Sequence, residues 1–145
     1  MTATALWIIA AVLAQGAIAF LLLWRLGAIR IPLVTRGKIH IGEIALSRDP
    51  WPIEEKRVSN AFDNQFQLPV LFYVACGVSL YYGPIWLEAL LAWVFVLSRI
   101  VHAAVFAIDN NVIRRFSAYT TGFIVLAILW IDLAVRLLLI AFGSR

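Results

Sequence analysis

Charged side chains are scarce in this sequence of 145 residues, and their scarcity excludes a soluble domain of this size. Asp, Glu, Lys and Arg make up 14% of the chain and hydrophobic residues 63%, whereas typical soluble domains carry about 25% charged and about 45–50% apolar residues. So few charges cannot form the polar shell of a water-soluble protein. The sequence therefore predicts that lipid covers the outside of the molecule.

Cysteine and histidine are also scarce, which limits the chemistry that the chain can perform. Cys76 is the only cysteine, so an internal disulfide and a cysteine metal cluster are excluded. It lies in an apolar run, where a small buried hydrophobic residue is expected. His40 and His102 are too far apart in sequence to form a metal-ligand spacing. The sequence has no Gly-rich phosphate loop and no Ser/His/Asp motif of known spacing.

Four hydrophobic segments are long enough to cross roughly 30 Å of hydrocarbon, which takes about 20 helical residues. The Gly83-Pro84 pair predicts a tight turn between the second and third segments. The predicted fold is an all-α integral membrane protein, a four-transmembrane-helix bundle with up-down-up-down topology and a single domain over residues 1–145. The helices are predicted over about residues 6–26, 54–82, 85–108 and 115–142.

Basic residues gather on one side of the predicted spans. The loop before the fourth helix carries Arg114 and Arg115, whereas the opposite side carries only Arg145. The positive-inside rule places both basic loops in the cytoplasm and both termini outside. Because loop arginines and lysines usually set topology, the net charge of +4 does not indicate nucleic-acid binding. The longer basic loop, between the first two helices, carries Arg30, Arg36, Lys38, Arg48, Lys56 and Arg57.

Polar residues inside the predicted spans share helix faces, which is informative because a charge near the bilayer centre costs about 2.5–3.5 kcal/mol. On the fourth helix, Arg115 and Tyr119 are an i, i+4 pair. On the second helix, the spacing i, i+3, i+7, i+10 forms one face from Arg57, Asn60, Asn64 and Gln67. On the third helix, one face carries Glu88, Phe95, Arg99, His102, Phe106 and Asp109.

These faces meet in the cytoplasmic half of the bundle, where they could form a polar, cationic pocket for a small anionic ligand. The alternative is interhelical packing, because Asn, Gln and His often join membrane helices through hydrogen bonds. Near the outer end, Asp132 and Arg136 are an opposite-charge i, i+4 pair, with Glu88 at a similar depth. These three residues predict a structural ion-pair network.

Several stretches resemble a known family. They are Arg57–Gln67 opening the second span, Arg99–His102 in the third, and Arg114–Tyr119 opening the fourth, with Arg48-Asp49-Pro50 ahead of the second. They are similar to the MAPEG family, which includes microsomal glutathione transferases, leukotriene C synthase and microsomal prostaglandin E synthase. The chain looks like a divergent, bacterial member, which implies the bacterial inner membrane.

The resemblance implies a homotrimer of four-helix subunits, with glutathione bound between neighbouring subunits near the cytoplasmic face. Arg115 matches the catalytic arginine that holds the glutathione sulfur as thiolate, and Tyr119 matches a tyrosine beside it. A guanidinium favours the anionic form of a thiol, whose free pKa is about 8.5. The residues expected to bind glutathione are Arg57, Asn60, Asn64, Gln67, Arg99 and His102.

Four positions depart from the family pattern. Asn60 replaces an arginine of the glutathione-handling members, Gln67 a glutamate, and Phe106 a tyrosine. Asp63 stands where several members have a basic or neutral residue. These changes are expected to weaken binding of a tripeptide with two carboxylates and an ammonium group.

Three functions are compatible with these residues. The first is a membrane-embedded glutathione-dependent transferase or peroxidase acting on lipophilic electrophiles that enter from lipid. The alternative is a non-catalytic MAPEG-like protein that binds another anionic lipid or metabolite, or a scaffold. A transporter or channel subunit is a third possibility, disfavoured because inverted repeats and unwound helices are not evident.

Overall fold

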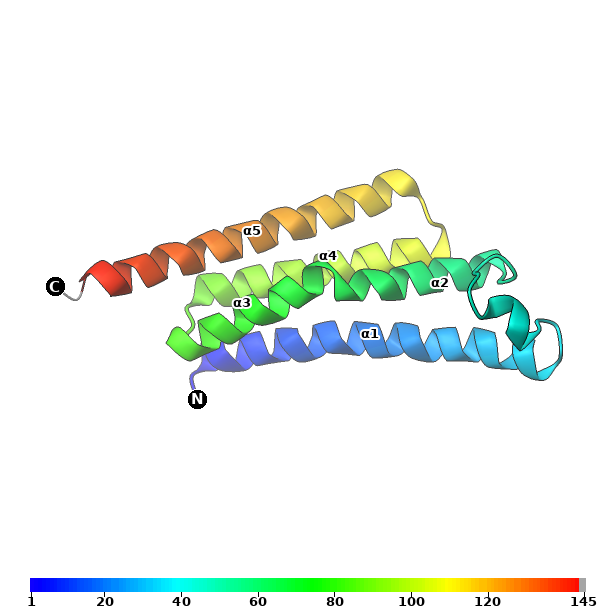
Figure 1. Ribbon diagram of the computed structural model, residues 1–145. Helices are drawn as coiled ribbons and strands as arrows, with labels where there is room; N and C mark the ends of the chain where they lie inside the picture. Colours follow the sequence, from blue (N-terminus) through cyan, green and yellow to red (C-terminus); the bar gives the residue numbers. More distant parts are fainter. Residues whose placement is uncertain (144–145) are drawn as a thin grey trace.

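The computed structural model describes residues 1–143, and this part of the chain is helical without any strand (Figure 1). Three long helices, α1 (Ala3–Thr35), α4 (Trp86–Ile108) and α5 (Val112–Gly143), each contain an apolar stretch long enough to cross a membrane. The remaining pass consists of α2 (Ile53–Asp63) and α3 (Leu68–Tyr82). Arg145, which the topology prediction used, lies outside the described residues.

The first helix is longer than predicted, because it continues past Leu26 to Thr35. In the added turns, Arg30 Nε donates to Glu55 Oε1 at 2.7 Å, and just before them Arg25 lies 3.3 Å from the carboxylate of Glu54. These ion pairs hold the extension against α2. The prediction ended the helix at Leu26, between Arg25 and Arg30, although apolar residues continue as far as Val34.

The predicted continuous second helix is wrong, because a 3₁₀ turn, η2 (Asn64–Phe66), separates α2 from α3. Pro69 lies in the first turn of α3. A proline has no N–H to donate to the carbonyl four residues back, and its ring clashes with that carbonyl, so a continuous α-helix is disfavoured at this point. At 1.5 Å per residue, the 15 residues of α3 span about 22 Å. α3 is therefore shorter than the roughly 30 Å hydrocarbon core, and α2 and η2 continue the same pass.

α4 is the central helix of the bundle: half of its apolar window is buried, against 22% in α1 and in α5. The N-terminus and the α3–α4 turn lie at one end of the bundle, and the α1–α2 connection and the α4–α5 turn at the other (Figure 1). Near the first end, Phe72 of α3 stacks on Phe95 of α4 with ring centroids 4.6 Å apart. This core combines α1, α3, α4 and α5 through Ile8, Ala11, Phe72, Ala75, Ala92, Phe95, Val96, Leu126 and Leu129.

The second core, near the α4–α5 turn, has a different composition. It joins α1, α2 and α4 through Leu22, Leu26, Val58, Ala61, Ala103, Phe106 and Ala107. α5 contributes no residue to this core.

The end of the bundle that carries the α3–α4 turn holds a buried ion pair between Glu88 and Arg136. Glu88 also accepts hydrogen bonds from Ser79 Oγ at 2.7 Å and from the Ile85 N–H at 3.0 Å. The predicted ion-pair network of Asp132, Arg136 and Glu88 is found in part: Arg136 pairs with Glu88, and no ion pair joins it to Asp132 within residues 1–143. Arg136 turns toward the α3–α4 connection, where Nη2 donates to the Gly83 carbonyl at 2.9 Å.

Candidate functional site

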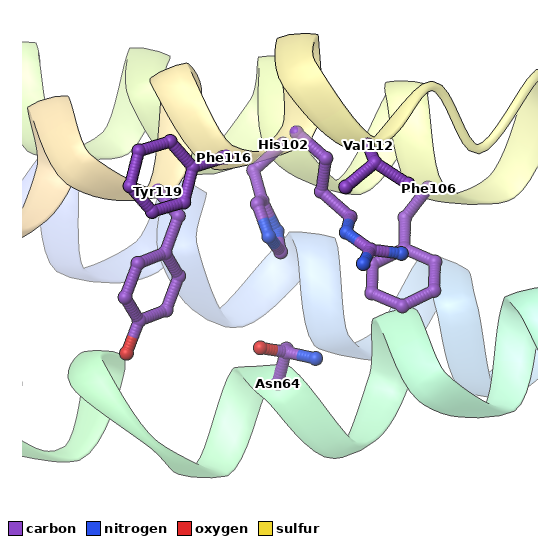
Figure 2. A pocket seen from close by; sticks show the side chains of 7 residues that line it. Asn64, His102, Phe106, Val112, Phe116 and Tyr119 are labelled. Atoms are coloured by element: carbon purple, nitrogen blue, oxygen red, sulfur yellow. The ribbon is translucent and has the colours of Figure 1, made fainter.

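A cleft of about 310 Å³ opens between η2, α4 and α5, toward the α4–α5 turn (Figure 2). Its walls combine polar and aromatic side chains from segments that are distant in sequence. The lining residues are Asn64, His102, Phe106, Val112, Arg115, Phe116 and Tyr119.

The guanidinium of Arg115 is held by two neighbours. Its Cζ lies 4.3 Å from the centroid of the Phe106 ring, and its Nη1 donates to Asn110 Oδ1 at 2.5 Å. Asn110 is in the turn between α4 and α5, with a φ of 54° in the left-handed region, which Asn tolerates better than most residues. Its N–H donates to the Val105 carbonyl at 2.7 Å. The turn that reverses the chain therefore also positions the cation of the cleft.

Asn64 presents a hydrogen-bond acceptor to the cleft. Its Nδ2 donates to the Asn60 carbonyl at 2.8 Å, which fixes the orientation of the amide. Figure 2 shows the amide of Asn64 below His102, on the opposite wall from the α5 side chains. The carbonyl oxygen of Asn64 is therefore available to an N–H group of a bound molecule.

Tyr119 and His102 line the cleft, and the buried Arg99 adjoins both of them. The His102 ring lies 5.7 Å from the Tyr119 ring, and the Arg99 Cζ lies 5.6 Å from the same ring. Arg99 is fully buried and its Nη2 lies 3.3 Å from His102 Nδ1. Its Nε and Nη1 have no hydrogen-bond partner within residues 1–143. An anion or acceptor that reached this depth would find unused donors, since a buried guanidinium is stabilised by such partners.

The structure brings five of the eight predicted site residues together and places the other three outside the cleft. Arg57 Nη1 donates to the Ile108 carbonyl at 3.2 Å, so it ties α2 to the end of α4. Asn60 is exposed and contributes its carbonyl to Asn64. Gln67 is exposed at the break before α3. The five that converge are Asn64, Arg99, His102, Arg115 and Tyr119.

Asp63, one of the positions that depart from the family pattern, pairs with Arg48 at 2.8 Å. The hydrogen bond to Asp63, together with its negative charge, raises the pKa of the Arg48 guanidinium above its ordinary value. Both side chains are largely exposed. The pair joins the α1–α2 connection to the end of α2, and it does not face the cleft.

Sequence reasoning did not identify three contributors to the site. Asn110 accepts a hydrogen bond from Arg115. The sequence feature that could have indicated it is the Asn110-Asn111 pair between the third and fourth predicted helices. Val112 and Phe116 form the apolar part of the cleft, and helical spacing from Arg115 and Tyr119 could have found them.

The cleft offers one cation, one phenol, one imidazole and one amide carbonyl beside apolar surface. No group of three or more His, Cys, Asp or Glu side chains that could hold a metal ion occurs within residues 1–143. The arrangement suits a small molecule that carries an anionic atom, an N–H donor and an adjoining apolar group.

A model of the MAPEG family matches residues 8–135 of the chain, a range that includes the whole cleft. The chain belongs to the MAPEG family. No match is found among curated proteins or among solved structures. MAPEG proteins are membrane proteins, so the exposed apolar surfaces of α1, α4 and α5 belong within a membrane. Large exposed side chains on these surfaces include Phe20, Leu21, Trp24, Leu97, Val101, Phe123, Leu138 and Leu139.

Proposed function

We propose that this MAPEG protein is a membrane-embedded, glutathione-dependent transferase or peroxidase that acts on lipophilic electrophiles. The observation that carries the proposal is the meeting of Arg115, Tyr119, His102 and Asn64 around one cleft. Three different segments contribute these side chains, and a cationic cleft in an apolar bundle needs an anionic partner.

The donor set fits the sulfur end of glutathione. The Arg115 guanidinium lies in the cleft wall, where its positive charge would favour thiolate over thiol. The Tyr119 hydroxyl would donate a hydrogen bond to the same sulfur, and the Asn64 carbonyl oxygen would accept a hydrogen bond from an N–H of the tripeptide. The sulfur would form a bond to the electrophile as the leaving group departs with its electron pair.

The apolar side of the cleft fits the second substrate. Val112 and Phe116 of α5 are 62% and 67% exposed and lie beside the cationic groups. A lipophilic molecule dissolved in the membrane could reach the cleft along this surface without crossing water. The apolar side chains beside the cationic group favour a reaction between a polar thiol and an apolar electrophile.

We further propose that the protein is a homotrimer with glutathione bound between neighbouring subunits. A tripeptide with two carboxylates needs more cationic contacts than the one guanidinium in the cleft. Exposed Asn60 and Gln67, and the partly exposed Arg57, would serve a molecule lying across such an interface. The proposed topology is up-down-up-down in a single domain, with both termini outside and the basic loops in the cytoplasm.

The test is conjugation of glutathione to 1-chloro-2,4-dinitrobenzene by the purified protein. Arg115→Ala is expected to lower kcat/KM by about a hundredfold, the loss typical of removing one group that stabilises developing charge. Arg114→Ala is the matched control, because the neighbouring Arg114 is exposed and pairs with Asp109 at 3.6 Å. Activity that survives Arg115→Ala, or that falls equally in both variants, would remove Arg115 from this role.

A second candidate function is binding of another anionic lipid or metabolite without catalysis. It is favoured by the engagement of Arg57 with the Ile108 carbonyl, which leaves one fewer free cation for glutathione. Thermal unfolding in detergent distinguishes the two, because a ligand at a hundred times its Kd stabilises by about 2.7 kcal/mol. Stabilisation by glutathione supports the transferase, and stabilisation by anionic lipid alone supports the second function.

A further inference from the structure

Two buried glutamines join α1 to the break between α2 and α3. Gln15 of α1 is 0% exposed and Gln65 of η2 is 3% exposed. Gln15 Nε2 donates to Gln65 Oε1 at 2.9 Å, across 50 residues of sequence. Both amides lie within a membrane bundle, where a polar group without a partner is costly.

The hydrogen bonds fix the orientation of both amides. Gln65 Nε2 donates to the Ala61 carbonyl at 3.0 Å, and only the nitrogen of the amide can do so. The Gln65 oxygen therefore points toward Gln15, and Gln15 must donate to it through its amide nitrogen. The remaining oxygen of Gln15 is buried without a partner within residues 1–143. Two apolar side chains would pack here without that unsatisfied acceptor, so packing alone does not explain the pair.

Gln65 follows Asn64 in the same 3₁₀ turn, and both side chains donate hydrogen bonds to carbonyls in the last turn of α2. Each donates to the carbonyl four residues back, Asn64 to Asn60 and Gln65 to Ala61. A 3₁₀ helix has about three residues per turn, so successive side chains point about 120° apart. While Gln65 is held toward α1, Asn64 is therefore turned toward α4 and α5, where Figure 2 shows it in the cleft.

We propose that Gln15 and Gln65 are positioning residues that hold Asn64 in the cleft. Neither lines the cleft, so they would act only through the geometry of η2. The consequence for catalysis depends on the proposed function, because Asn64 is assigned there to the tripeptide. Loss of the glutamine bond should weaken glutathione binding and leave the thiolate end, held by Arg115, in place.

The test uses Gln15→Met and Gln65→Met, since methionine has nearly the shape of glutamine without its amide. Two quantities are measured in detergent: amide hydrogen exchange at residues 64–67 without ligand, and the separate kcat and KM for glutathione. Each variant is expected to raise local exchange and KM by roughly three- to thirty-fold, the range for one hydrogen bond between membrane helices. kcat should change less than twofold, and exchange in α5 should not change.

The double variant and a control complete the experiment. If the two glutamines act through their mutual hydrogen bond, adding Gln15→Met to Gln65→Met should cause little further increase in local exchange or in KM. Thr4→Val, a buried change of similar kind on α1, should leave exchange at residues 64–67 and KM as they were. Should Gln65→Met not fold, Gln15→Met removes the same bond while preserving the cap on Ala61.

The outcomes separate this inference from the proposed function. Unchanged exchange at η2 in Gln15→Met overturns the positioning role, and so does a fall in kcat at constant KM. A native protein with no glutathione-dependent activity overturns the proposed function, while the exchange measurement still decides whether the glutamine pair fixes the turn.

Discussion

The guanidinium carbon of Arg115 lies 4.3 Å from the centroid of the Phe106 ring. Phe106 occupies the position at which the family resemblance expects a tyrosine. A phenyl ring has no hydroxyl to donate, but its face attracts a cation. The departure therefore substitutes a stacking contact for a hydrogen bond, and it keeps the catalytic candidate in the cleft wall.

Replacing this ring tests whether it positions the cation. Phe106→Leu removes the cation–π contact, worth about 0.5–2 kcal/mol according to exposure, and should lower kcat/KM for conjugation by roughly two- to thirtyfold. Phe123→Leu is the control, because Phe123 lies on α5, is 53% exposed and does not line the cleft. Equal losses in the two variants would show that Phe106 contributes only bulk.

A second prediction concerns the buried pair at the end of the bundle near the α3–α4 turn. Glu88 is fully buried and joins Arg136 to Ser79 and to the Ile85 N–H. Glu88→Gln leaves Arg136 without its counter-charge, and breaking a buried pair in this way costs about 3–5 kcal/mol. Because this end lies far from the cleft, we expect a lower Tm in detergent with an unchanged KM for glutathione in the folded fraction.

Two further variants show whether the pairing itself is responsible. Glu88→Gln with Arg136→Met removes both charges and should recover part of the lost Tm. Asp63→Asn breaks the largely exposed pair with Arg48, and such pairs are worth only about 0–1 kcal/mol. If Asp63→Asn lowered Tm as much as Glu88→Gln, burial would not be the source of the stability.

The sequence predicted the face of α4 well, for a physical reason. A regular helix repeats every 3.6 residues, so the spacing of Phe95, Arg99, His102 and Phe106 could be followed without knowing the fold. All four are buried. The cost of placing polar groups in lipid allows little other orientation for Arg99 and His102.

The second pass could not be predicted in the same way. The spacing of Arg57, Asn60, Asn64 and Gln67 describes one face only if the α-helix is continuous, and η2 interrupts it. Beyond the 3₁₀ turn the side-chain directions are offset, so Gln67 leaves the face that Asn64 occupies. The responsible residue, Pro69, was visible in the sequence, but how the chain reorganises around a proline depends on tertiary contacts such as the Gln15–Gln65 bond.

The contact between α4 and α5 beside Arg99 depends on Gly122. A Cβ at this position would lie 2.6 Å from Ser98 Oγ and 3.7 Å from Arg99 Cδ. Ser98 Oγ donates to the Phe95 carbonyl at 2.6 Å, so Gly122→Ala would force the hydroxyl out of this bond. A lost hydrogen bond of this kind costs about 0.5–1.5 kcal/mol, and Tm in detergent should fall accordingly.

Making Gly122→Ala in a Ser98→Ala background tests whether the Ser98 hydroxyl is what a Cβ at position 122 would meet. In Ser98→Ala the Oγ is absent and the remaining neighbours are at ordinary contact distance. Gly122→Ala should then be nearly neutral, because a methyl group fits the space that the hydroxyl vacates. An equal Tm loss in both backgrounds would instead place the constraint on the helix backbones. The hydroxyl would then be incidental, and the close packing of α4 on α5 would be what holds Arg99 behind the cleft.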